Sequence, residues 1–370
     1  MRKILILMGR YLPGHKDGGP LRTMINVTDA LGDEYEFYIG CLDRDHGDTE
    51  PYAGIERDKW NQVGKAQVWY VLPGQFTNEL ILRLAEGKDL IYLCSFYDDY
   101  GYKTLLLKRK KKVKCPVVIA SMGVFSKGAL AQKAWKKKIF IAGCKTIGLF
   151  NDIIWSVTSE LEANDIKSVI GNIQYVVAED LPRSNIPGIG KKNKQYSVAF
   201  LSRISPKKNL LGAIQIMQKV RSEVFFTIYG PDEDIEYWKA CKRELKKLPS
   251  NVQWCYEGDV PSEDVQKKLS QHDVFLFPTL GENYGHVIFE ALSVGCIPVI
   301  SDQTPWQIIA EKQAGFVLGL DNLTCFADRI DELANMSREK RMNMQQRCVQ
   351  IAIDKVESNK RETGYRTIFG

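Results

Sequence analysis

The stretch DVFLFPTLGENYGHVIFEALSVGCIPVISD, from Asp273 to Asp302, carries the pattern that decides the fold. Its run VFLF is continuously apolar, which is typical of a strand in a parallel sheet that is covered on both faces. Pro278 ends this strand, a turn with two glycines follows, and HVIFEALS has the apolar spacing of a helix that stops near Gly295. CIPVIS is a further apolar run. The order strand, helix, strand predicts a doubly wound α/β sheet.

The same alternation of apolar runs and helical patterns extends along the whole chain. In the first half, strands are predicted at KILILMG, YEFYIGCL, AQVWYVL, DLIYLCSF, PVVIASMG, IIWSVTS and IQYVVA. In the second half, they are predicted at QYSVAFLSRI, VFFTIYGP, NVQWCYEG, DVFLFPT, CIPVISD and AGFVLGL. A chain of 370 residues exceeds what one hydrophobic core usually supports. We therefore expect two doubly wound domains, with ligands bound beyond the carboxyl ends of the strands, in the cleft between the domains.

A break in the pattern separates the two halves. The segment EDLPRSNIPGIGKKNKQ is rich in Pro, Gly and Lys and has few apolar residues, which indicates an interdomain linker. We predict a first Rossmann-like domain over residues 1–180, a linker over 181–195 and a second Rossmann-like domain over 196–350. The helical pattern over 351–370 is expected to cross back to the first domain.

The composition is that of an ordinary soluble globular protein, with 44% hydrophobic and 26% charged residues. The nine cysteines form no CxxC pair and no metal-ligand spacing, which favours a reducing cytoplasmic setting and argues against a disulfide framework or a zinc site. The opening letters MRKILILMG resemble a signal peptide, but the apolar run is short and no cleavage site follows, so we expect a buried first strand. No apolar run approaches the roughly 18 residues that a membrane span requires.

Basic charge is concentrated in one segment. The net charge is +6, yet Tyr100 to Asn151 alone contain 13 Lys or Arg and no Asp or Glu. Basic and apolar residues are mixed within it at Trp135, Lys136, Lys137, Lys138, Ile139 and Phe140. This mixture suits docking on an anionic membrane surface, so we expect a protein that is peripheral at the inner face of the cell membrane. A solvated helix face beside a lysine-rich loop is the open alternative. Nucleic acid is a third, less favoured partner, because the known binding motifs and the interleaved stacking aromatics are absent.

Two familiar phosphate-binding motifs are missing from the chain. It has no GxxxxGK[ST], which argues against a P-loop nucleoside triphosphatase, and no GxGxxG after the first strand, which disfavours a standard dinucleotide dehydrogenase. The first strand is followed instead by GRYLPGHKDGGPLRT, in which Gly18 and Gly19 precede a predicted helix. Tandem glycines let backbone NH groups approach an anion at a helix N-terminus. A tight turn that uses glycine explains the same letters equally well.

Two cations follow the first strand of the second domain, in LSRISPKKN. Arg203 and Lys208 are five positions apart at the carboxyl end of that strand. A guanidinium fork and an ammonium at such a place suit a diphosphate. A solvated basic loop is the alternative reading.

Two glutamates lie on either side of the predicted start of the helix in the opening stretch. Glu282 falls in the turn, and Glu290 falls about one turn into the helix, among apolar neighbours. A carboxylate in such surroundings is unfavourable unless it has a partner, and a ribose diol is a suitable one. The alternative is that Glu290 is exposed and Glu282 is a plain turn residue. The backbone NH groups of the residues between them lie near the helix N-terminus, which suits a phosphate.

The segment ENYGHVIFE is similar to the E-x7-E motif of the retaining nucleotide-sugar glycosyltransferases of family 4, which have the GT-B fold. Four other elements occur in the family's order: DGGPLRTMINVTDAL, VTSELEA, FLSRISPKKNL and IYGPDED. The resemblance covers nearly the whole chain. It implies a hexosyl transferase that builds surface polysaccharide or glycolipid from a nucleoside diphosphate sugar, expected to be a UDP-sugar. It also implies a saccharide or polyprenyl diphosphate-linked acceptor, and neither a metal nor another cofactor.

The resemblance also implies residue roles. Glu282 would contact the sugar hydroxyls as the nearest group to a catalytic residue, acting by positioning. Glu290 would bind the ribose, and Arg203 and Lys208 the diphosphate. The remaining donor contacts would come from Gly19, Val260, Asn283, Tyr284, Gly285, His286 and Val287. Retention would proceed by attack on the face that the leaving group departs from, so the two glutamates are not read as a glycosidase pair.

The chain departs from the family pattern in the first domain. Many relatives carry a His or Arg after the fifth strand, where ASMGVFS here places Met122, followed by Gly123. This departure concerns the contact to the far end of the sugar, and therefore donor identity. His15 lies in a predicted site loop on the same domain and is a candidate for the acceptor or sugar side. A sugar-nucleotide epimerase of similar architecture is the main alternative function, and a basic nucleic-acid-binding protein a less favoured one.

Overall fold

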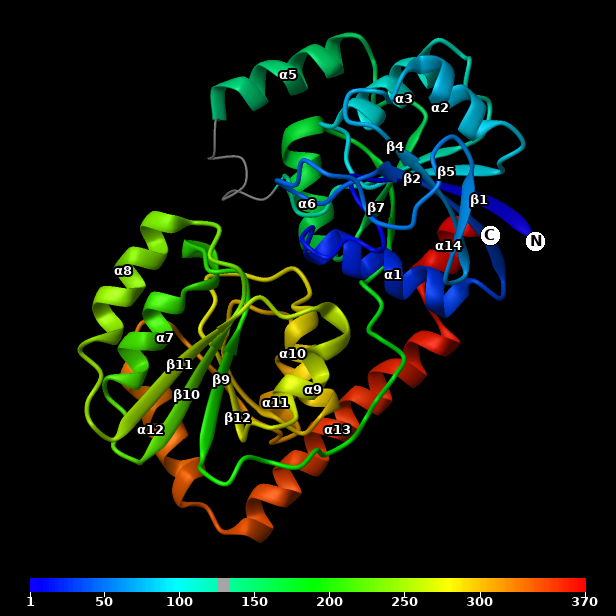
Figure 1. Cartoon of the computed structure of the whole chain (residues 1–370). Coiled ribbons are helices and arrows are strands. Elements are labelled where there is room, and N and C mark those ends of the chain that lie inside the picture. Colours follow the sequence, from blue (N-terminus) through cyan, green and yellow to red (C-terminus); the bar gives the residue numbers. More distant parts are fainter. Residues whose placement is uncertain (126–133) are drawn as a thin grey trace. The chain divides into compact units, whose positions relative to one another are not determined.

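The computed structural model describes residues 1–125 and 134–370 (Figure 1). It divides the chain into two compact units. The first unit comprises Met1–Leu181 together with Asn359–Gly370, and the second comprises Pro182–Ser358. The chain therefore ends in the unit in which it began.

The first unit is built on an eight-stranded sheet in the order β3-β4-β2-β1-β5-β6-β7-β8. β3 pairs antiparallel with β4, and every other neighbouring pair is parallel. The strands are β1 (Arg2–Leu7), β2 (Tyr35–Leu42), β3 (Trp60–Val63), β4 (Ala66–Val71), β5 (Leu90–Leu93), β6 (Val117–Ala120), β7 (Ile153–Val157) and β8 (Gln174–Val177).

Helices cover both faces of this sheet (Figure 1). The helices are α1 (Gly19–Leu31), α2 (Asn78–Ala85), α3 (Asp99–Arg109), α5 (Ala134–Thr146), α6 (Glu160–Ile170) and α14 (Gly364–Phe369). In β1, Ile4 and Ile6 pack in the core under α1 and α14, whereas Leu5 and Leu7 pack in the core under α2, α3, α5 and α6. Successive side chains of a strand point to opposite faces, so a strand with two covered faces must be apolar throughout.

The second unit is a six-stranded parallel sheet in the order β11-β10-β9-β12-β13-β14. Its strands are β9 (Ser197–Leu201), β10 (Val224–Tyr229), β11 (Val252–Gly258), β12 (Val274–Phe277), β13 (Ile297–Ser301) and β14 (Phe316–Leu318). The chain first builds outward from β9 through β10 to β11 and then restarts on the other side of β9 with β12. The carboxyl ends of β9 and β12 therefore flank the topological switch point, where sheets of this kind bind ligands.

The helices of the second unit connect these parallel strands. They are α7 (Leu210–Met217), α8 (Ile235–Leu245), α9 (Val265–Leu269), α10 (His286–Ser293), α11 (Ile308–Glu311), α12 (Leu323–Asn335) and α13 (Arg338–Arg361), with the short 3-10 helices η1 (Pro206–Lys208) and η2 (Ser262–Asp264). The chain passes from the second unit to the first within α13, between Ser358 and Asn359.

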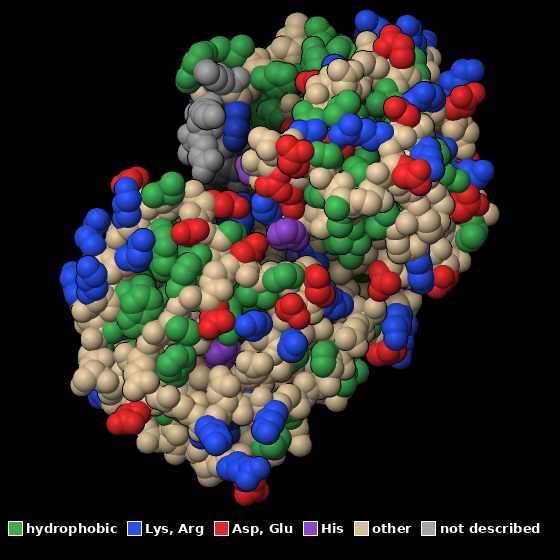
Figure 2. All heavy atoms as spheres, in the orientation of Figure 1, with side chains coloured by type: hydrophobic (Ala, Val, Ile, Leu, Met, Phe, Trp, Pro, Cys, Tyr) green, Lys and Arg blue, Asp and Glu red, His purple; other side chains and the backbone are tan. Residues whose placement is uncertain are grey.

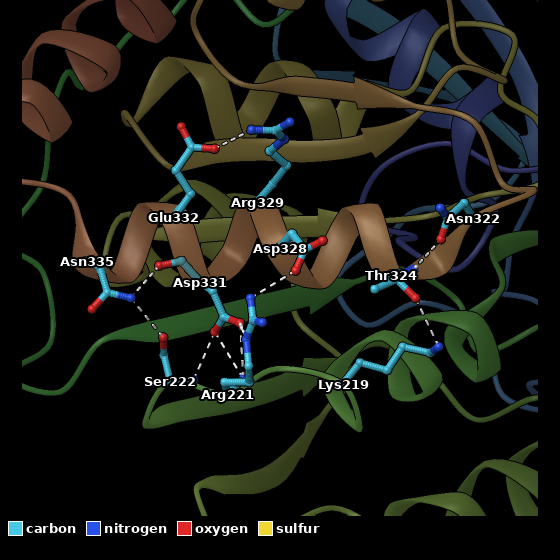
Figure 3. A network of polar contacts seen from close by, with 10 residues as sticks. All are labelled: Lys219, Arg221, Ser222, Asn322, Thr324, Asp328, Arg329, Asp331, Glu332 and Asn335. Carbon is cyan, nitrogen blue, oxygen red and sulfur yellow. Dashed lines mark hydrogen bonds and ion pairs between the residues drawn. The ribbon is translucent and has the colours of Figure 1, made fainter.

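A polar clamp fastens α12 to the turn after α7 (Figure 3). The carboxylate of Asp331 accepts hydrogen bonds from the backbone NH of Arg221 at 3.0 Å, from its Nε at 2.9 Å, and from the backbone NH of Ser222 at 2.9 Å. Burial works to raise the pKa of Asp331, but these hydrogen bonds prevail and hold the pKa below its usual value. Asp331 therefore stays ionised in the folded protein and contributes to its stability.

One strand escaped the sequence analysis. β3 forms a hairpin with β4 around Gly64, whose φ of 56° lies in the left-handed region. It was missed because WNQV has two polar residues at its centre. As an edge strand its side chains are half-buried or exposed, so it lacks the continuous apolar run of a central strand.

The segment 181–195, expected as a linker, contains neither helix nor strand. It runs along the second unit, where the Lys192 Nζ donates to the carbonyl of Gly295 at 3.1 Å and the Asn193 NH to that of Gln271 at 2.8 Å. Among the described helices, none is both long enough and apolar enough to cross a membrane.

Candidate functional site

Two loops meet at the switch point of the second unit. The loop after β9 ends at Asn209, and the loop after β12 begins at Pro278. The Leu280 NH donates to the Lys207 carbonyl at 2.9 Å, and the Asn209 Nδ2 donates to the Pro278 carbonyl at 2.8 Å. The Thr279 Oγ1 adds a second bond to the Lys207 carbonyl at 3.1 Å. These bonds hold the two loops in one fixed arrangement.

Asn209 has a second role in this arrangement. Its φ of 58° places it in the left-handed region, and its Oδ1 accepts the Gly212 NH at 3.1 Å as the N-cap of α7. Asparagine suits this place because it tolerates the left-handed region and its short side chain caps a helix. One residue thus fixes both the start of α7 and the neighbouring loop.

The structure brings Lys208 and Glu282 into direct contact through the Lys208 Nζ and Glu282 Oε1. Both side chains are mostly buried, with 18% of Lys208 and 11% of Glu282 exposed. The Thr279 Oγ1 also lies 3.4 Å from Glu282 Oε1. Burial lowers the pKa of Lys208; the nearby Glu282 acts against this shift, and the neighbouring Lys207 and Arg203 add to it. Three cations therefore share this loop, and the Glu282 carboxylate contacts one of them, Lys208, so the remaining positive charge suits an anion.

Arg203 occupies a more open position than Lys208. It is 54% exposed, and its Nη1 lies 3.8 Å from the Glu233 Oε2, in the loop after β10. An exposed pair at this distance is weak, because water screens both charges. Arg203 is therefore able to exchange Glu233 for a ligand phosphate at little energetic cost.

The N-terminus of α10 adjoins Glu282. Gly285, its N-cap, has a φ of 82°, and a Cβ added there would lie 2.9 Å from the Ile288 Cδ1. Both facts favour glycine at this position. An α-helix leaves its first backbone NH groups without an intrahelical acceptor, so those of His286 and Val287 are available in principle to an anion.

Aromatic packing fixes the approach to α10. Tyr284 is buried, its carbonyl accepts a hydrogen bond from the Trp306 Nε1, and its ring lies 4.9 Å from that of His286 and 5.4 Å from that of Trp306. His286 and Val287 are half-buried, and Asn283 is exposed. All five residues from Asn283 to Val287 therefore lie at the helix start, as the sequence predicts.

Glu290 is buried, with 3% of the residue exposed. Its Oε1 lies 3.9 Å from the Nε of Arg183. The alternative of an exposed helix residue is thereby wrong. The sequence analysis missed Arg183, whose only signal was its position in an otherwise unremarkable linker, 107 residues before Glu290.

Arg183 also reaches the loop after β11. Its Nη2 donates to the Ser262 carbonyl at 3.2 Å and lies 3.4 Å from the Ser262 Oγ. Val260, the expected contact to a base, lies in the same loop, is half-buried and packs against the core of the second unit. Arg183 thus joins Glu290 to the loop that carries Val260.

The other expected site residues belong to the first unit. Gly19 begins α1 after Gly18, whose φ is 64°, and among the described residues a Cβ built on Gly19 meets nothing within 4 Å apart from its chain neighbours and its own helix. The backbone NH of His15 donates to the Asp45 Oδ2 at 2.7 Å, and its Nδ1 lies 3.5 Å from the same oxygen. Asp45 is buried and fixes this loop, which the sequence analysis did not predict.

The turn at Met122 and Gly123 is held by a buried carboxylate. Both residues have left-handed φ values, 49° and 74°. The Glu162 Oε1 accepts the Gly123 NH at 2.7 Å and the hydroxyl of Ser121, and its Oε2 accepts the Thr158 NH at 2.7 Å. Glu162 therefore sets the direction in which Met122 and Gly123 face.

The basic segment contributes the helix α5. Trp135 and Ile139 are each 65% exposed, and Lys138 between them is also exposed. Lys138 and Ile139 follow Trp135 by three and four residues, so both lie beside it on one side of the helix. Figure 2 shows hydrophobic side chains at the surface over this helix.

The opposite side of α5 packs on aromatic rings of the first unit. Phe140 lies 5.5 Å from the ring of Tyr97 and 6.3 Å from that of Phe96, and the Lys137 Nζ lies 6.0 Å from the Tyr97 ring. The Lys136 side chain and residues 126–133, which contain part of the predicted basic segment, lie outside the described residues. In the described part of the chain, no group of three or more His, Cys, Asp or Glu is arranged to hold a metal ion.

Comparison with protein families shows what the second unit resembles. Residues 183–350 match the family model described as "Glycosyl transferases group 1". The second unit is therefore similar to the group 1 glycosyltransferases. The matched segment contains Arg183, the Lys208–Glu282 pair and Glu290, so every contact described for the switch point lies inside it.

Similar proteins include glycosyltransferases. The chain is 22% identical over 260 residues to the GDP-mannose:cellobiosyl-diphosphopolyprenol alpha-mannosyltransferase of Xanthomonas oryzae pv. oryzae, covering 69% of this chain and 67% of that protein. Among solved structures, HepE of Anabaena, in complex with UDP and glucose, has a TM-score of 0.70 at 14% identity over 98% of both chains. WaaG, a glycosyltransferase involved in lipopolysaccharide biosynthesis, has a TM-score of 0.63 at 13% identity, covering 96% of this chain and 98% of WaaG. The chain therefore has the GT-B fold of these glycosyltransferases.

Proposed function

We propose that the protein transfers a sugar from a nucleoside diphosphate sugar to a saccharide or lipid-linked saccharide acceptor, with retention of anomeric configuration. The observation that carries this proposal is the contact between Lys208 and Glu282 at the switch point, next to the N-terminus of α10. It supplies a cation for a phosphate and an acceptor for sugar hydroxyls side by side.

The diphosphate would be held by charge that is already in place. Lys208 is held by Glu282, and Arg203 can exchange its exposed partner Glu233 for a phosphate. The first backbone NH groups of α10 add further donors. Such preorganised donors stabilise negative charge as it develops on a leaving diphosphate. We propose that these groups act without a metal ion, so an excess of EDTA is expected to leave the rate unchanged.

Retention would follow from attack on the face from which the diphosphate leaves. The bond between the anomeric carbon and the β-phosphate oxygen breaks, the acceptor oxygen bonds to that carbon, and its proton passes to the departing phosphate oxygen. Glu282 would hold the sugar hydroxyls and so fix the anomeric carbon beside Lys208. The Lys208 contact holds the Glu282 carboxylate in place, which suits positioning better than proton transfer.

The proposal also concerns which nucleotide the donor carries. The sequence resemblance favours a UDP-sugar, and one structural relative was solved with UDP and glucose. A curated relative is named instead for GDP-mannose. Because Glu290 would bind the ribose, which both nucleotides share, the described contacts serve either donor.

We further propose that α5 docks on an anionic membrane surface, where a lipid-linked acceptor would be found. Its exposed Trp135 and Ile139 supply apolar contact, and the exposed Lys138 beside them attracts anionic headgroups. Binding to vesicles with 30% anionic lipid is expected to weaken about fivefold in Lys138→Ala, because one Lys near an anionic surface contributes about 1 kcal/mol. The charge-matched Lys246→Ala variant, altered on an exposed residue of the second unit, is expected to bind as wild type. Equal binding by all three proteins would contradict docking through α5.

A thermal-shift panel of UDP, GDP, ADP and their sugars tests the function itself. A bound nucleotide stabilises the folded state by mass action, so the correct donor raises Tm. That donor is expected to be hydrolysed slowly in the absence of acceptor, and Glu282→Ala and Lys208→Ala are expected to lower the rate at least 100-fold. An epimerase would instead return an isomerised sugar nucleotide. Unchanged hydrolysis in both variants would contradict the proposed site.

A further inference from the structure

We propose that Arg183 is a positioning residue for ribose recognition. It would hold the Glu290 carboxylate in the orientation that receives the ribose hydroxyls and would tie it to the loop that borders the base. This inference rests on the proposed function, since it assigns a role within the same donor site.

Arg183 has a geometry suited to this role. Its Nε faces the Glu290 Oε1 at 3.9 Å, and its Nη2 donates to the Ser262 carbonyl at 3.2 Å. Two different nitrogens of one guanidinium thus contact two different elements, α10 and η2. These nitrogens hold fixed positions on one planar group, whereas lysine offers a single nitrogen, which favours arginine over lysine.

Burial explains why Glu290 needs such a partner. The carboxylate side chain is 4% exposed and that of Arg183 is 22% exposed. A buried carboxylate is unfavourable without a nearby cation and hydrogen-bond donors. Arg183 places its positive charge 3.9 Å from the carboxylate, and a nearby cation favours the ionised form, which accepts from a diol.

Arg183 also links the ribose contact to the base contact. Ser262 follows Val260 by two residues in the loop after β11, and Val260 is the expected contact to the base. An arginine anchored at Ser262 fixes the distance between that loop and Glu290. Ribose and base would then be recognised as one rigid unit, whichever base the donor carries.

The test compares binding of a ribonucleotide with that of its 2′-deoxy counterpart. The probe is UDP or GDP, whichever gives the larger thermal shift with wild type, against 2′-deoxy-UDP or 2′-deoxy-GDP by isothermal titration calorimetry. A site built to bond a hydroxyl rejects an analogue that lacks it, so wild type is expected to prefer the ribonucleotide at least tenfold. Arg183→Ala is expected to reduce this preference to threefold or less.

The controls separate positioning from general damage. Arg203→Ala is expected to weaken both nucleotides by similar factors and leave their ratio as in wild type, because Arg203 would contact only the diphosphate. Glu290→Gln is expected to lose the preference, and adding Arg183→Ala to it is expected to change the ratio no further. Arg183→Lys, which keeps the charge, covers the case in which the alanine variant does not fold, and its ratio is expected to lie between those of wild type and Glu290→Gln.

The outcomes are distinguishable. A wild-type ratio in a folded Arg183→Ala or Arg183→Lys protein would overturn the role of Arg183 while leaving the donor site intact. Equal weakening of both nucleotides would also overturn it, because that result indicates a structural role only. If wild type binds no nucleoside diphosphate at all, the proposed function fails instead.

Discussion

Replacing Glu282 with glutamine tests whether Glu282 positions the sugar while Lys208 binds the phosphate. The two side chains touch, and both are largely shielded from water. Glutamine keeps the shape of glutamate and one acceptor oxygen but removes the charge. Burial already lowers the pKa of Lys208, so the ammonium would then lack its compensating carboxylate.

The expected magnitude follows from Coulomb's law. Two unit charges about 4 Å apart at an effective dielectric constant near 20 attract by about 4 kcal/mol. The amide dipole that replaces the carboxylate recovers part of this energy, and the remaining exposure screens more of it. We expect a phosphate to gain about 1–2 kcal/mol of attraction to Lys208 when the carboxylate is removed. This gain corresponds to roughly five- to thirtyfold tighter binding of the free nucleoside diphosphate.

Catalysis should respond in the opposite direction. Glu282 would position the sugar, so donor hydrolysis by Glu282→Gln is expected to fall about 100-fold even though the nucleotide binds more tightly. Calorimetric titration gives the affinity, and release of nucleotide from the donor gives the rate. Lys208→Met is the matched control, because it removes the cation itself and is expected to weaken nucleotide binding in either background. Weaker nucleotide binding by Glu282→Gln than by wild type would refute the reasoning.

Three further predictions concern stability and backbone geometry. Burial raises the pKa of Asp180 to about 7, so between pH 4 and 7 the folded protein holds a proton that the unfolded chain releases. The free energy of unfolding should therefore fall by up to about 4 kcal/mol as pH rises from 4 to 7. Urea unfolding of Asp180→Asn should show a smaller decline over this range. The pKa of Asp331 is lowered, so Asp331→Ala should reduce the unfolding free energy by about 2–3 kcal/mol at pH 7. The difference in unfolding free energy between this variant and wild type should become smaller as pH falls below about 4. A difference that does not depend on pH would contradict the clamp. Gly285→Ala should lower both Tm and the rate of donor hydrolysis, because a left-handed φ and the nearby Ile288 both oppose a Cβ. Gly19→Ala, whose Cβ would enter open space, should change the unfolding free energy by less than about 0.5 kcal/mol. Similar losses of stability in both variants would contradict the backbone argument.

Local pattern was enough to predict most of the fold. The central parallel strands are apolar on both faces, so each of their apolar runs was visible by itself, as in the buried residues of β12. The position of Glu290 among apolar neighbours correctly indicated burial. β3 failed the same test because an edge strand needs few apolar residues.

The contacts within the site were beyond local reading. Lys208 and Glu282 are 74 residues apart, and Arg183 and Glu290 are 107 apart, so their meeting depends on which strands are neighbours. That order is set by packing across the whole sheet rather than by any short stretch. The sequence resemblance implied Lys208 and Glu282 as separate ligands but gave no sign that they hold each other. Arg183 had no motif at all.

The most direct test of the account is a crystal structure of the protein with its nucleoside diphosphate bound. The account predicts a phosphate oxygen within hydrogen-bond distance of the Lys208 Nζ, further phosphate contacts at the N-terminus of α10, and both ribose hydroxyls on the Glu290 carboxylate. A nucleotide bound away from the loops after β9 and β12, or a ribose that does not touch Glu290, would contradict it.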